Sequence, residues 1–280
     1  MPGHTGAADR PERAGRCRPP DRRPASPRSR RRTSASSPTR RPARRPPMRP
    51  VTLYCFHHAG GNPAGFRPLR AALAPEVDVV PLALERPGES ATIESIAEDV
   101  GQGLTGVDLG DAHLYGHSMG GLVAYELCRT RAERGESLPR SLVLAAVAPP
   151  GALDPSDGRA EALLRAGARL LPAPGLAERT TAGVRRSLAY APPVRPVPTP
   201  FELVHGTRDE VVTAQLMRGW GEYTHGRLRE HAVDDGHLFH RAPALARLVR
   251  SLLVPGAPAP VCTRARRHGR GPVASTGLSA

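Results

Sequence analysis

The stretch HLYGHSMGGLVAYELCR, from His113 to Arg129, decides how this chain folds. An apolar run ends at Gly116, and a pattern with helical spacing begins directly after Ser118. The serine therefore lies where a buried strand turns sharply into a helix, in a G-x-S-x-G arrangement that raises a hydroxyl above a sheet. Bulky side chains two positions before or after the serine would collide in such a turn, so glycine is required at 116 and at 120. The pattern predicts that Ser118 is an exposed nucleophile.

Strand-like and helical segments alternate on both sides of this turn. Such alternation predicts right-handed crossovers and an α/β fold with a doubly wound, mainly parallel sheet that is covered on both faces. Thr92 is the predicted N-cap of one of the helices, because apolar residues follow it at helical spacing. The predicted strands are 51–56, 77–84, 112–116, 141–149, 201–206 and 227–233, and the predicted helices are 66–74, 92–104, 119–135 and 242–254.

Residues 151–199 interrupt the alternation. They hold two helical stretches, 159–171 and 178–191, and then a proline-rich exit. We interpret this insertion as a short helical lid over the carboxyl edge of the sheet, with a plain crossover as the alternative. The insertion carries seven arginines against four acidic residues, which suits docking of an acidic partner and is equally compatible with an ordinary solvated face.

The basic residues gather at the two ends of the chain. Residues 1–47 hold 14 arginines, three acidic residues and ten prolines, and they carry a net charge of +11. Residues 255–280 carry +4, which leaves −1 for residues 48–254. Segments so poor in large apolar residues cannot offset their ordering entropy, so we predict one folded domain, 48–254, between a disordered arm and a disordered tail. Met48 offers an alternative start, in which case the arm is not translated.

Composition also narrows the partners and the compartment. An arginine-rich arm can neutralise phosphates, but nucleic-acid binding is not the favoured interpretation. No run of 18 apolar residues predicts a membrane span, and no apolar segment in the arm predicts a secretory signal. The four cysteines lack metal-ligand spacing, which fits free thiols in the cytoplasm. These cysteines are Cys17, Cys55, Cys128 and Cys262.

A serine hydroxyl is a poor nucleophile without a base, which in this fold comes late in the chain. His237 lies in DDGHLFH (234–240), in a loop after the strand predicted at 227–233. This is where the fold brings its base to the serine, so we predict His237 as the base. His240 is the alternative.

The acid is expected after the strand predicted at 201–206. Asp209 lies there in the sequence HGTRDEVV and would hold the imidazole in the required tautomer. The alternatives for the acid are Glu210, Asp234 and Asp235.

Two backbone amides are predicted to form an oxyanion hole. The amide of Met119 opens the helix after the serine, and the amide of Ala59 lies in the glycine-rich loop FHHAGG (56–61) after the first strand. His58 is interpreted either as a residue that orients this loop or as a partly buried histidine without chemistry.

Several of these segments together resemble the type II thioesterases, which are stand-alone α/β-hydrolases of polyketide and nonribosomal peptide biosynthesis. The resemblance covers roughly residues 50–254 and is carried by LYCFHHAGG, GHSMGG, HGTRDEVV and DDGHLFH. It implies an α/β-hydrolase fold, with Ser118, Asp209 and His237 at the triad positions and Ala59 and Met119 at the oxyanion positions. The chain departs from the family pattern at His57, at LERPGES (84–90) and in the short insertion.

The resemblance implies hydrolysis of acyl groups from the phosphopantetheine arm of acyl or peptidyl carrier proteins, which clears misprimed or stalled units. It implies no metal and no nucleotide or other cofactor, because the substrate itself carries the phosphopantetheine. A small-molecule carboxylesterase or lipase with the same triad is the first alternative. A catalytically silent interaction protein that binds through its arginine arm is the second.

Overall fold

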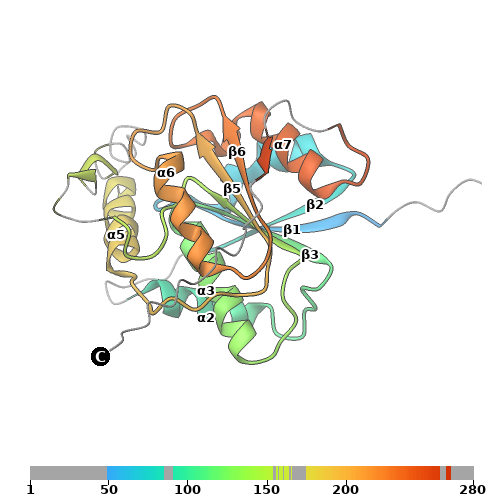
Figure 1. Cartoon of the computed structure of the whole chain (residues 1–280), viewed down its shortest axis with the longest axis horizontal. Coiled ribbons are helices and arrows are strands. Elements are labelled where there is room, and N and C mark those ends of the chain that lie inside the picture. Colours follow the sequence, from blue (N-terminus) through green and yellow to red (C-terminus); the bar gives the residue numbers. More distant parts are fainter. Residues whose placement is uncertain are drawn as a thin grey trace, which may run out of the picture. The chain divides into compact units, whose positions relative to one another are not determined.

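The computed structural model describes residues 49–84, 91–153, 175–258 and 263–265, together with 156, 158, 159, 161–163 and 165. Within these residues, seven strands form one sheet (Figure 1), and their order in the sheet is β2-β1-β3-β4-β5-β6-β7. The first six strands are parallel to their neighbours, and β7 pairs antiparallel with β6. The predicted α/β fold with a mainly parallel sheet is therefore confirmed. The strands are β1 (Val51–Phe56), β2 (Val77–Leu82), β3 (Ala112–His117), β4 (Ser141–Ala145), β5 (Phe201–Gly206), β6 (Leu228–Val233) and β7 (Thr263–Ala265).

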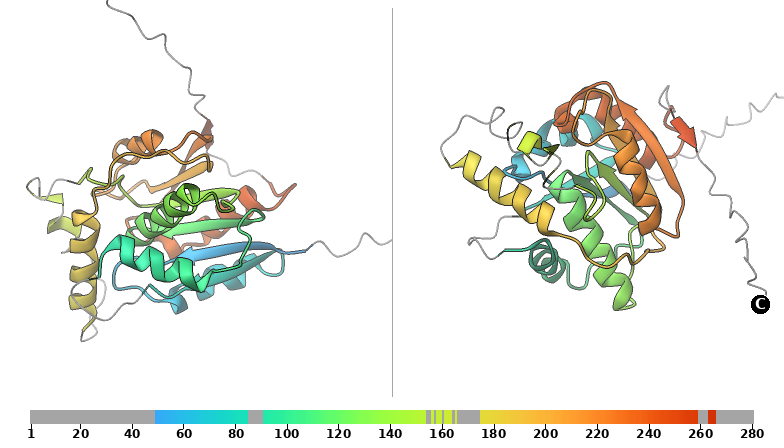
Figure 2. Two further views of the ribbon diagram at one scale, coloured as in Figure 1. Left: turned by 90° about the horizontal axis from the view of Figure 1, so that it is seen from below. Right: turned by 60° about the vertical axis from the view of Figure 1, so that its left-hand side comes forward.

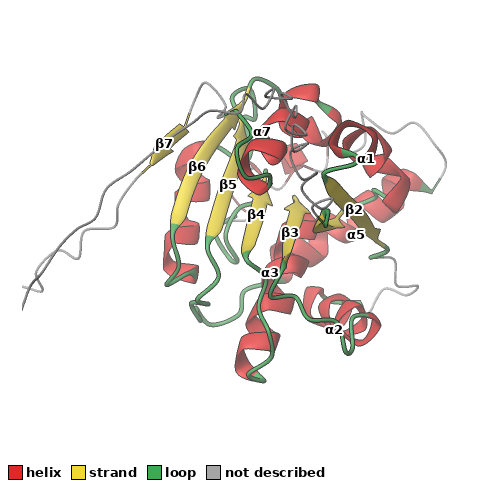
Figure 3. Cartoon of the chain, turned by 90° about the vertical axis from the view of Figure 1, so that its right-hand side faces the viewer, coloured by secondary structure: helices red, strands yellow, loops and turns green. Residues whose placement is uncertain are grey.

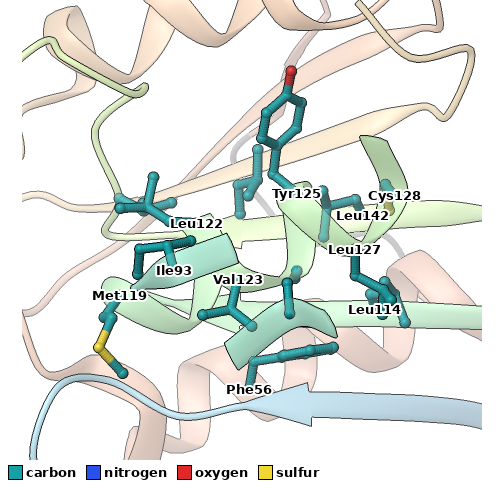
Figure 4. Packing of buried hydrophobic residues seen from close by; sticks show 14 of the residues in the cluster. Phe56, Ile93, Leu114, Met119, Leu122, Val123, Tyr125, Leu127, Cys128 and Leu142 are labelled. Carbon is teal, nitrogen blue, oxygen red and sulfur yellow. The ribbon is translucent and has the colours of Figure 1, made fainter. Parts of the chain in front are cut away.

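Helices cover the two faces of the sheet (Figure 3). Each face buries its own apolar cluster. On one face, α2 (Ile93–Gly103) and α3 (Met119–Glu133) pack against residues such as Phe56 and Leu142 (Figure 4). On the other face, α1 (Arg67–Leu73) and α7 (Pro243–Leu253) pack over the opposite side chains of the same strands. Alternate residues of each central strand therefore enter different clusters, so both sides of the strands must be apolar.

Thr92 caps α2 as predicted. Its side-chain oxygen accepts a hydrogen bond from the amide of Ser95, and the Ser95 hydroxyl in turn accepts one from the amide of Thr92. This reciprocal capping box satisfies two of the amides that a helix N-terminus leaves without a partner. Behind the cap, Ile93, Ile96 and Val100 are buried on one side of the helix, as their spacing predicts.

Two segments differ from the prediction on the carboxyl side of β4 and β5. The predicted strand 141–149 ends at Ala145, because Ala146 adopts a φ of 48° and the backbone is no longer extended there. The next carbonyl, that of Val147, accepts a hydrogen bond of 2.8 Å from the indole of Trp220. Trp220 belongs to a helical segment that the sequence analysis did not predict. That segment comprises α6 (Ala214–Met217) and the 3-10 helix η3 (Arg218–Tyr223).

The two ends of the chain were both predicted to be disordered. Residues 1–47 lie outside the described residues. Within 255–280, the three residues of β7 are paired with β6, so disorder is the wrong prediction for them. Backbone pairing with an otherwise open edge strand supplies hydrogen bonds that composition alone does not reveal. None of the helices in the described part of the chain is long and apolar enough to span a membrane.

The helix α5 (Leu176–Ala189) confirms the second helix predicted in the insertion and lies across the carboxyl end of the strands (Figure 2). It approaches the loop after β1 so closely that only glycine fits at two positions. A Cβ at Gly183 would lie 2.6 Å from the Ala59 side chain, and one at Gly60 would lie 2.1 Å from the Thr180 hydroxyl. The first predicted helix of the insertion, 159–171, lies largely outside the described residues, as does the loop 85–90.

The exit of α5 is tied to α3 through a buried carboxylate. The Tyr190 hydroxyl donates to Glu126 at 2.6 Å, and the Arg129 guanidinium binds the same carboxylate. One residue earlier on α3, the Tyr125 hydroxyl donates to the carbonyl of Arg195. Charge-assisted hydrogen bonds are strong when they are buried. Tyr125 and Glu126 of α3 therefore fix the segment that follows α5.

Candidate active site

Ser118 lies in the turn between β3 and α3, and its backbone is in a conformation that L-residues seldom adopt, with φ 53° and ψ −126°. Its amide donates to the carbonyl of Ala145 on the neighbouring strand at 2.8 Å. The turn leaves no room for side chains beside it. A Cβ at Gly116 would lie 2.4 Å from the Cα of Gly121, and one at Gly120 would lie 2.3 Å from the carbonyl oxygen of Phe56. The strained turn is thus held by its surroundings.

The structure brings His237 and Asp209 to this serine from two distant loops. The Nε2 atom of His237 lies 3.1 Å from the Oγ of Ser118, and its Nδ1 lies 2.7 Å from Oδ2 of Asp209. Asp209 follows β5 and His237 follows β6, so both lie at the carboxyl edge of the parallel sheet. The turn after β3, which carries Ser118, lies at the same edge. The three side chains form one continuous hydrogen-bonded series.

The Asp209 carboxylate is buried and uses both of its oxygens. One oxygen, Oδ2, faces His237, and the other, Oδ1, accepts hydrogen bonds from the amides of Val211 and Val212 at 3.1 and 3.0 Å. This arrangement fixes the rotation of the carboxylate, so that His237 must carry its proton on Nδ1 and present a lone pair on Nε2 to the serine.

The alternative acids and the alternative base lie elsewhere. Asp234 accepts hydrogen bonds from Thr207 and Arg208 at the surface, and Glu210 is exposed. The Asp235 carboxylate accepts from the amide of Gly236. His240 lies in the 3-10 helix η4 (Phe239–Arg241), buried against other histidine rings, with no hydrogen bond to Ser118 among the described residues. The geometry therefore favours Asp209 and His237.

An apolar pocket opens beside the Ser118 hydroxyl and has a volume of about 490 Å³ including its open mouth. Ala59 and Met119 lie in its wall next to the serine. Met119 is the first residue of α3, so its amide has no carbonyl of the helix to donate to. The far wall comes from α5, which contributes Val184, Ser187 and Leu188, and from the segment 146–151 after β4. In the described part of the chain, no three His, Cys, Asp or Glu side chains are arranged to hold a metal ion.

Three buried histidine rings, His58, His117 and His240, lie together beside His237. His58 and His240 have ring centroids 4.8 Å apart, and His117 lies 5.2 Å from His240 and 5.9 Å from His237. Burial, reinforced by the neighbouring imidazoles, lowers the pKa of His58 to about 4 and of His240 to about 3. Burial likewise holds the pKa of His117 well below its usual value. His58 donates from Nδ1 to the carbonyl of Ala59 at 2.9 Å, which fits a role in orienting the loop.

This cluster predicts that the protein loses stability in mild acid. Between pH 6.5 and about 4, these histidines stay neutral in the folded state and become protonated in the unfolded state, so unfolding takes up protons. The free energy of unfolding should therefore fall as the pH falls, by up to about 1.4 kcal/mol per pH unit for each histidine. Urea unfolding at pH 7.5, 6.5 and 5.5 measures this slope.

The matched variant for this measurement is His240→Gln, which removes one titrating ring from the cluster. This variant should show a smaller decrease in the free energy of unfolding as the pH falls below 6.5. The decrease that remains comes from the other acid-sensitive groups. An unfolding free energy that does not change between pH 7.5 and 5.5 in the parent protein would contradict the prediction.

The sequence alone did not indicate the part that His117 plays in this arrangement. The spacing of Tyr115 and His117, two residues apart on one strand, placed both side chains on the same face of the sheet and was the available signal. What it could not show is that the loop after β6 passes against that face.

Comparisons with known proteins match this chain over its folded part. A family model described as "Thioesterase domain" matches residues 51–253. The "Probable cadicidin biosynthesis thioesterase" of Streptomyces griseus is 26% identical over 217 residues, which are 68% of this chain and 58% of that relative. The chain thus spans less than two thirds of the length of this relative.

Two solved structures are similar over most of their length. The RedJ thioesterase from the prodiginine biosynthetic pathway in Streptomyces coelicolor is 29% identical with a TM-score of 0.60, and the match covers 76% of this chain and 90% of that one. The type II thioesterase BorB from the borrelidin biosynthetic cluster is 28% identical with a TM-score of 0.59, and the match covers 73% of this chain and 94% of that one.

Proposed function

The chain belongs to the thioesterase domain family, and on this premise we propose that it hydrolyses acyl thioesters with Ser118, His237 and Asp209. The observation that carries the proposal is the hydrogen-bonded series from the serine hydroxyl through the imidazole to the carboxylate, next to an apolar pocket. A base-activated serine beside an apolar cavity suits an acyl chain that is joined to a good leaving group.

In the proposed reaction, Nε2 of His237 takes the proton of Ser118 while Oγ attacks the thioester carbonyl carbon. The amides of Ala59 and Met119 stabilise the resulting oxyanion, and each such donor contributes about 3 kcal/mol to transition-state stabilisation. The carbon–sulfur bond then breaks, and the thiol leaves with the proton held by His237. Water, deprotonated by His237, attacks the carbonyl carbon of the acyl-enzyme. The bond from that carbon to Oγ of Ser118 then breaks, His237 returns the proton to Oγ, and the carboxylic acid leaves.

The proposed substrate is an acyl group on the phosphopantetheine arm of an acyl or peptidyl carrier protein. The proposed role is to clear misprimed or stalled units during polyketide or nonribosomal peptide synthesis. Support comes from the similar proteins, whose names place them in the prodiginine, borrelidin and cadicidin biosynthetic systems. The proposal assigns no cofactor to the enzyme itself.

A cytoplasmic location is part of the same proposal. Cys55 and Cys128 are buried free thiols, which suits a reducing compartment.

Mass spectrometry of acyl-loaded carrier proteins tests this function. We expect kcat/KM for a carrier-bound acyl chain to exceed that for the p-nitrophenyl ester of the same acid by at least about tenfold. A series of chain lengths and branching patterns then defines the acyl group that fits the pocket. Each reaction is run beside Ser118→Ala protein, which separates enzymatic from spontaneous hydrolysis.

The other outcomes assign the chain to the alternative classes. Hydrolysis of the aryl ester with no turnover of acyl-carrier protein would indicate a small-molecule esterase with the same side chains. Turnover of neither substrate by the parent protein would indicate an interaction protein in which the hydrogen-bonded series is idle.

A further inference from the structure

His117 is the last residue of β3 and directly precedes Ser118, and its side chain is fully buried. The ring contacts Phe239 at a centroid distance of 4.9 Å, in addition to the histidine rings described above. Its two nitrogens do not point to the serine. Each of them makes one hydrogen bond, and together these bonds link the strand to the loop that carries His237.

The protonation of each atom in this link follows from the partners. Nε2 of His117 lies 2.8 Å from the backbone carbonyl oxygen of His237, which can only accept, so Nε2 carries the proton. Burial keeps the ring neutral, so Nδ1 is an acceptor. The Tyr115 hydroxyl, 3.0 Å from Nδ1, therefore donates to it. The link thus runs from tyrosine hydroxyl to imidazole to backbone carbonyl, with every donor matched to an acceptor.

From this geometry we infer that His117 is a positioning residue for the hydrolysis, which holds the backbone of His237 so that its imidazole reaches both Ser118 and Asp209. Tyr115 supports it by fixing which nitrogen of His117 carries the proton. The inference rests on the proposed function of His237 as the base. The carboxyl end of β3 thereby positions both reacting groups. The turn that follows the strand positions Ser118, and His117 positions the base His237.

The rest of the loop explains why this contact matters. Residues 234 and 235 are held at the surface: the amide of Arg208 donates to the carbonyl of Asp235, and the Arg208 side chain pairs with Asp234. The Arg208–Asp234 pair is exposed, and an exposed ion pair holds a loop weakly. The bond from His117 to the carbonyl of His237 is buried. A displacement of about 1 Å in a catalytic group can cost as much as 10²-fold in rate.

The same strand offers a matched control. His113 lies four residues before His117 on the same face of β3, and its Nδ1 hydrogen-bonds the Ser141 hydroxyl at 2.7 Å. Burial lowers the pKa of His113 to about 4, so it too is a neutral, hydrogen-bonded imidazole. It lies at the other end of the strand, away from Ser118. Removing it costs packing and a hydrogen bond without touching the loop of His237.

The test measures steady-state hydrolysis of a propionyl N-acetylcysteamine thioester by the full chain and its variants. His117→Leu removes the donor at similar volume and should lower kcat by about 10- to 100-fold, with KM changed by no more than about twofold. His117→Gln keeps an N–H near the position of Nε2 and should restore kcat to within about fivefold of the parent. Tyr115→Phe, which removes one oxygen atom, should lower kcat by about threefold or more. His113→Leu should leave kcat within about twofold.

A spectroscopic readout separates positioning from general loss of structure. The proton between His237 and Asp209 gives a far-downfield NMR resonance when that short hydrogen bond is held. It should broaden or vanish in His117→Leu and persist in His117→Gln and His113→Leu. Thermal melting of each variant records the structural cost. If His117→Leu does not fold, Tyr115→Phe carries the test with the same resonance and the same kcat measurement.

The outcomes distinguish this inference from the proposed function. If Ser118→Ala hydrolyses the thioester as well as the parent, the proposed function fails and the inference fails with it. If Ser118→Ala is inactive while His117→Leu, or Tyr115→Phe in its place, keeps the kcat and resonance of the parent, only the positioning role is overturned. Equal losses in His117→Leu and His113→Leu would also overturn it, because both would then reflect stability alone.

Discussion

Ser118→Ala should lower kcat for thioester hydrolysis by about 10⁴-fold or more, to the level that binding and the oxyanion donors alone can give. The hydroxyl removed is the one that donates to Nε2 of His237 at 3.1 Å and would attack the carbonyl carbon, so no covalent acyl-enzyme can form. The folded state should survive, because alanine is smaller than serine and the hydroxyl makes no other hydrogen bond in the described structure. Single-turnover assays with an acyl thioester, together with thermal melting, check both statements.

The pocket provides a matched serine for this prediction. Ser187 on α5 lines the same cavity, but its hydroxyl donates to the carbonyl of Gly183 within the helix. Ser187→Ala should therefore keep kcat within about threefold of the parent. If the two alanine variants lose activity to the same extent, the loss reflects the shape of the pocket, and Ser118 is not the nucleophile.

Asp209→Asn should lower kcat by about 10⁴-fold, even though the change is nearly isosteric. The amides of Val211 and Val212 both point at one oxygen of the carboxylate, so the asparagine must place its carbonyl there. Its NH₂ group then faces Nδ1 of His237, which has to become an acceptor. The proton moves to Nε2, and the imidazole can no longer take the proton of Ser118.

The control for this variant is Glu210→Gln, which makes the same chemical change on the neighbouring, exposed residue. It should leave kcat within about twofold of the parent. Measuring kcat of Asp209→Asn from pH 6 to pH 10 adds a second check. Because His237 stays in the wrong tautomer, kcat should remain low across the whole range. Near-normal turnover by Asp209→Asn at neutral pH would show that the carboxylate does not determine the tautomer of the His237 imidazole.

The parts of this molecule that repeat a local pattern could be predicted from the sequence. The turn at Ser118 is determined by residues that are close in the sequence. These are two glycines, the apolar run before the serine and the helix after it. The mainly parallel sheet also follows from the alternation of strands and helices, and the family matches confirm the predicted resemblance to type II thioesterases. Asp209 and His237 were predicted because loops after parallel strands meet at one edge of the sheet.

What the sequence could not reveal depends on contacts between distant segments. The link from His117 to His237 joins residues 120 positions apart. The segment with Trp220 lacks a long helical period, and it is held by hydrogen bonds to distant groups, among them the carbonyls of Val147 and Pro150. The three residues of β7 carry no hydrophobic pattern and were predicted with the disordered tail. In each case hydrogen bonds or strand pairing between distant segments decide the structure, and local propensity does not reveal them.

The close packing of α5 against the loop after β1 limits how the enzyme could be redesigned to accept other acyl groups. Gly60 and Gly183 let the helix approach so closely that an added Cβ would overlap the Thr180 hydroxyl or the Ala59 side chain. Larger residues at these two positions would lift the whole helix and disturb the Ala59 loop along with the cavity. Val184 and Leu188 instead contribute only side chains to the cavity wall. Libraries that vary 184 and 188 while keeping both glycines are therefore the rational starting point for changing substrate range.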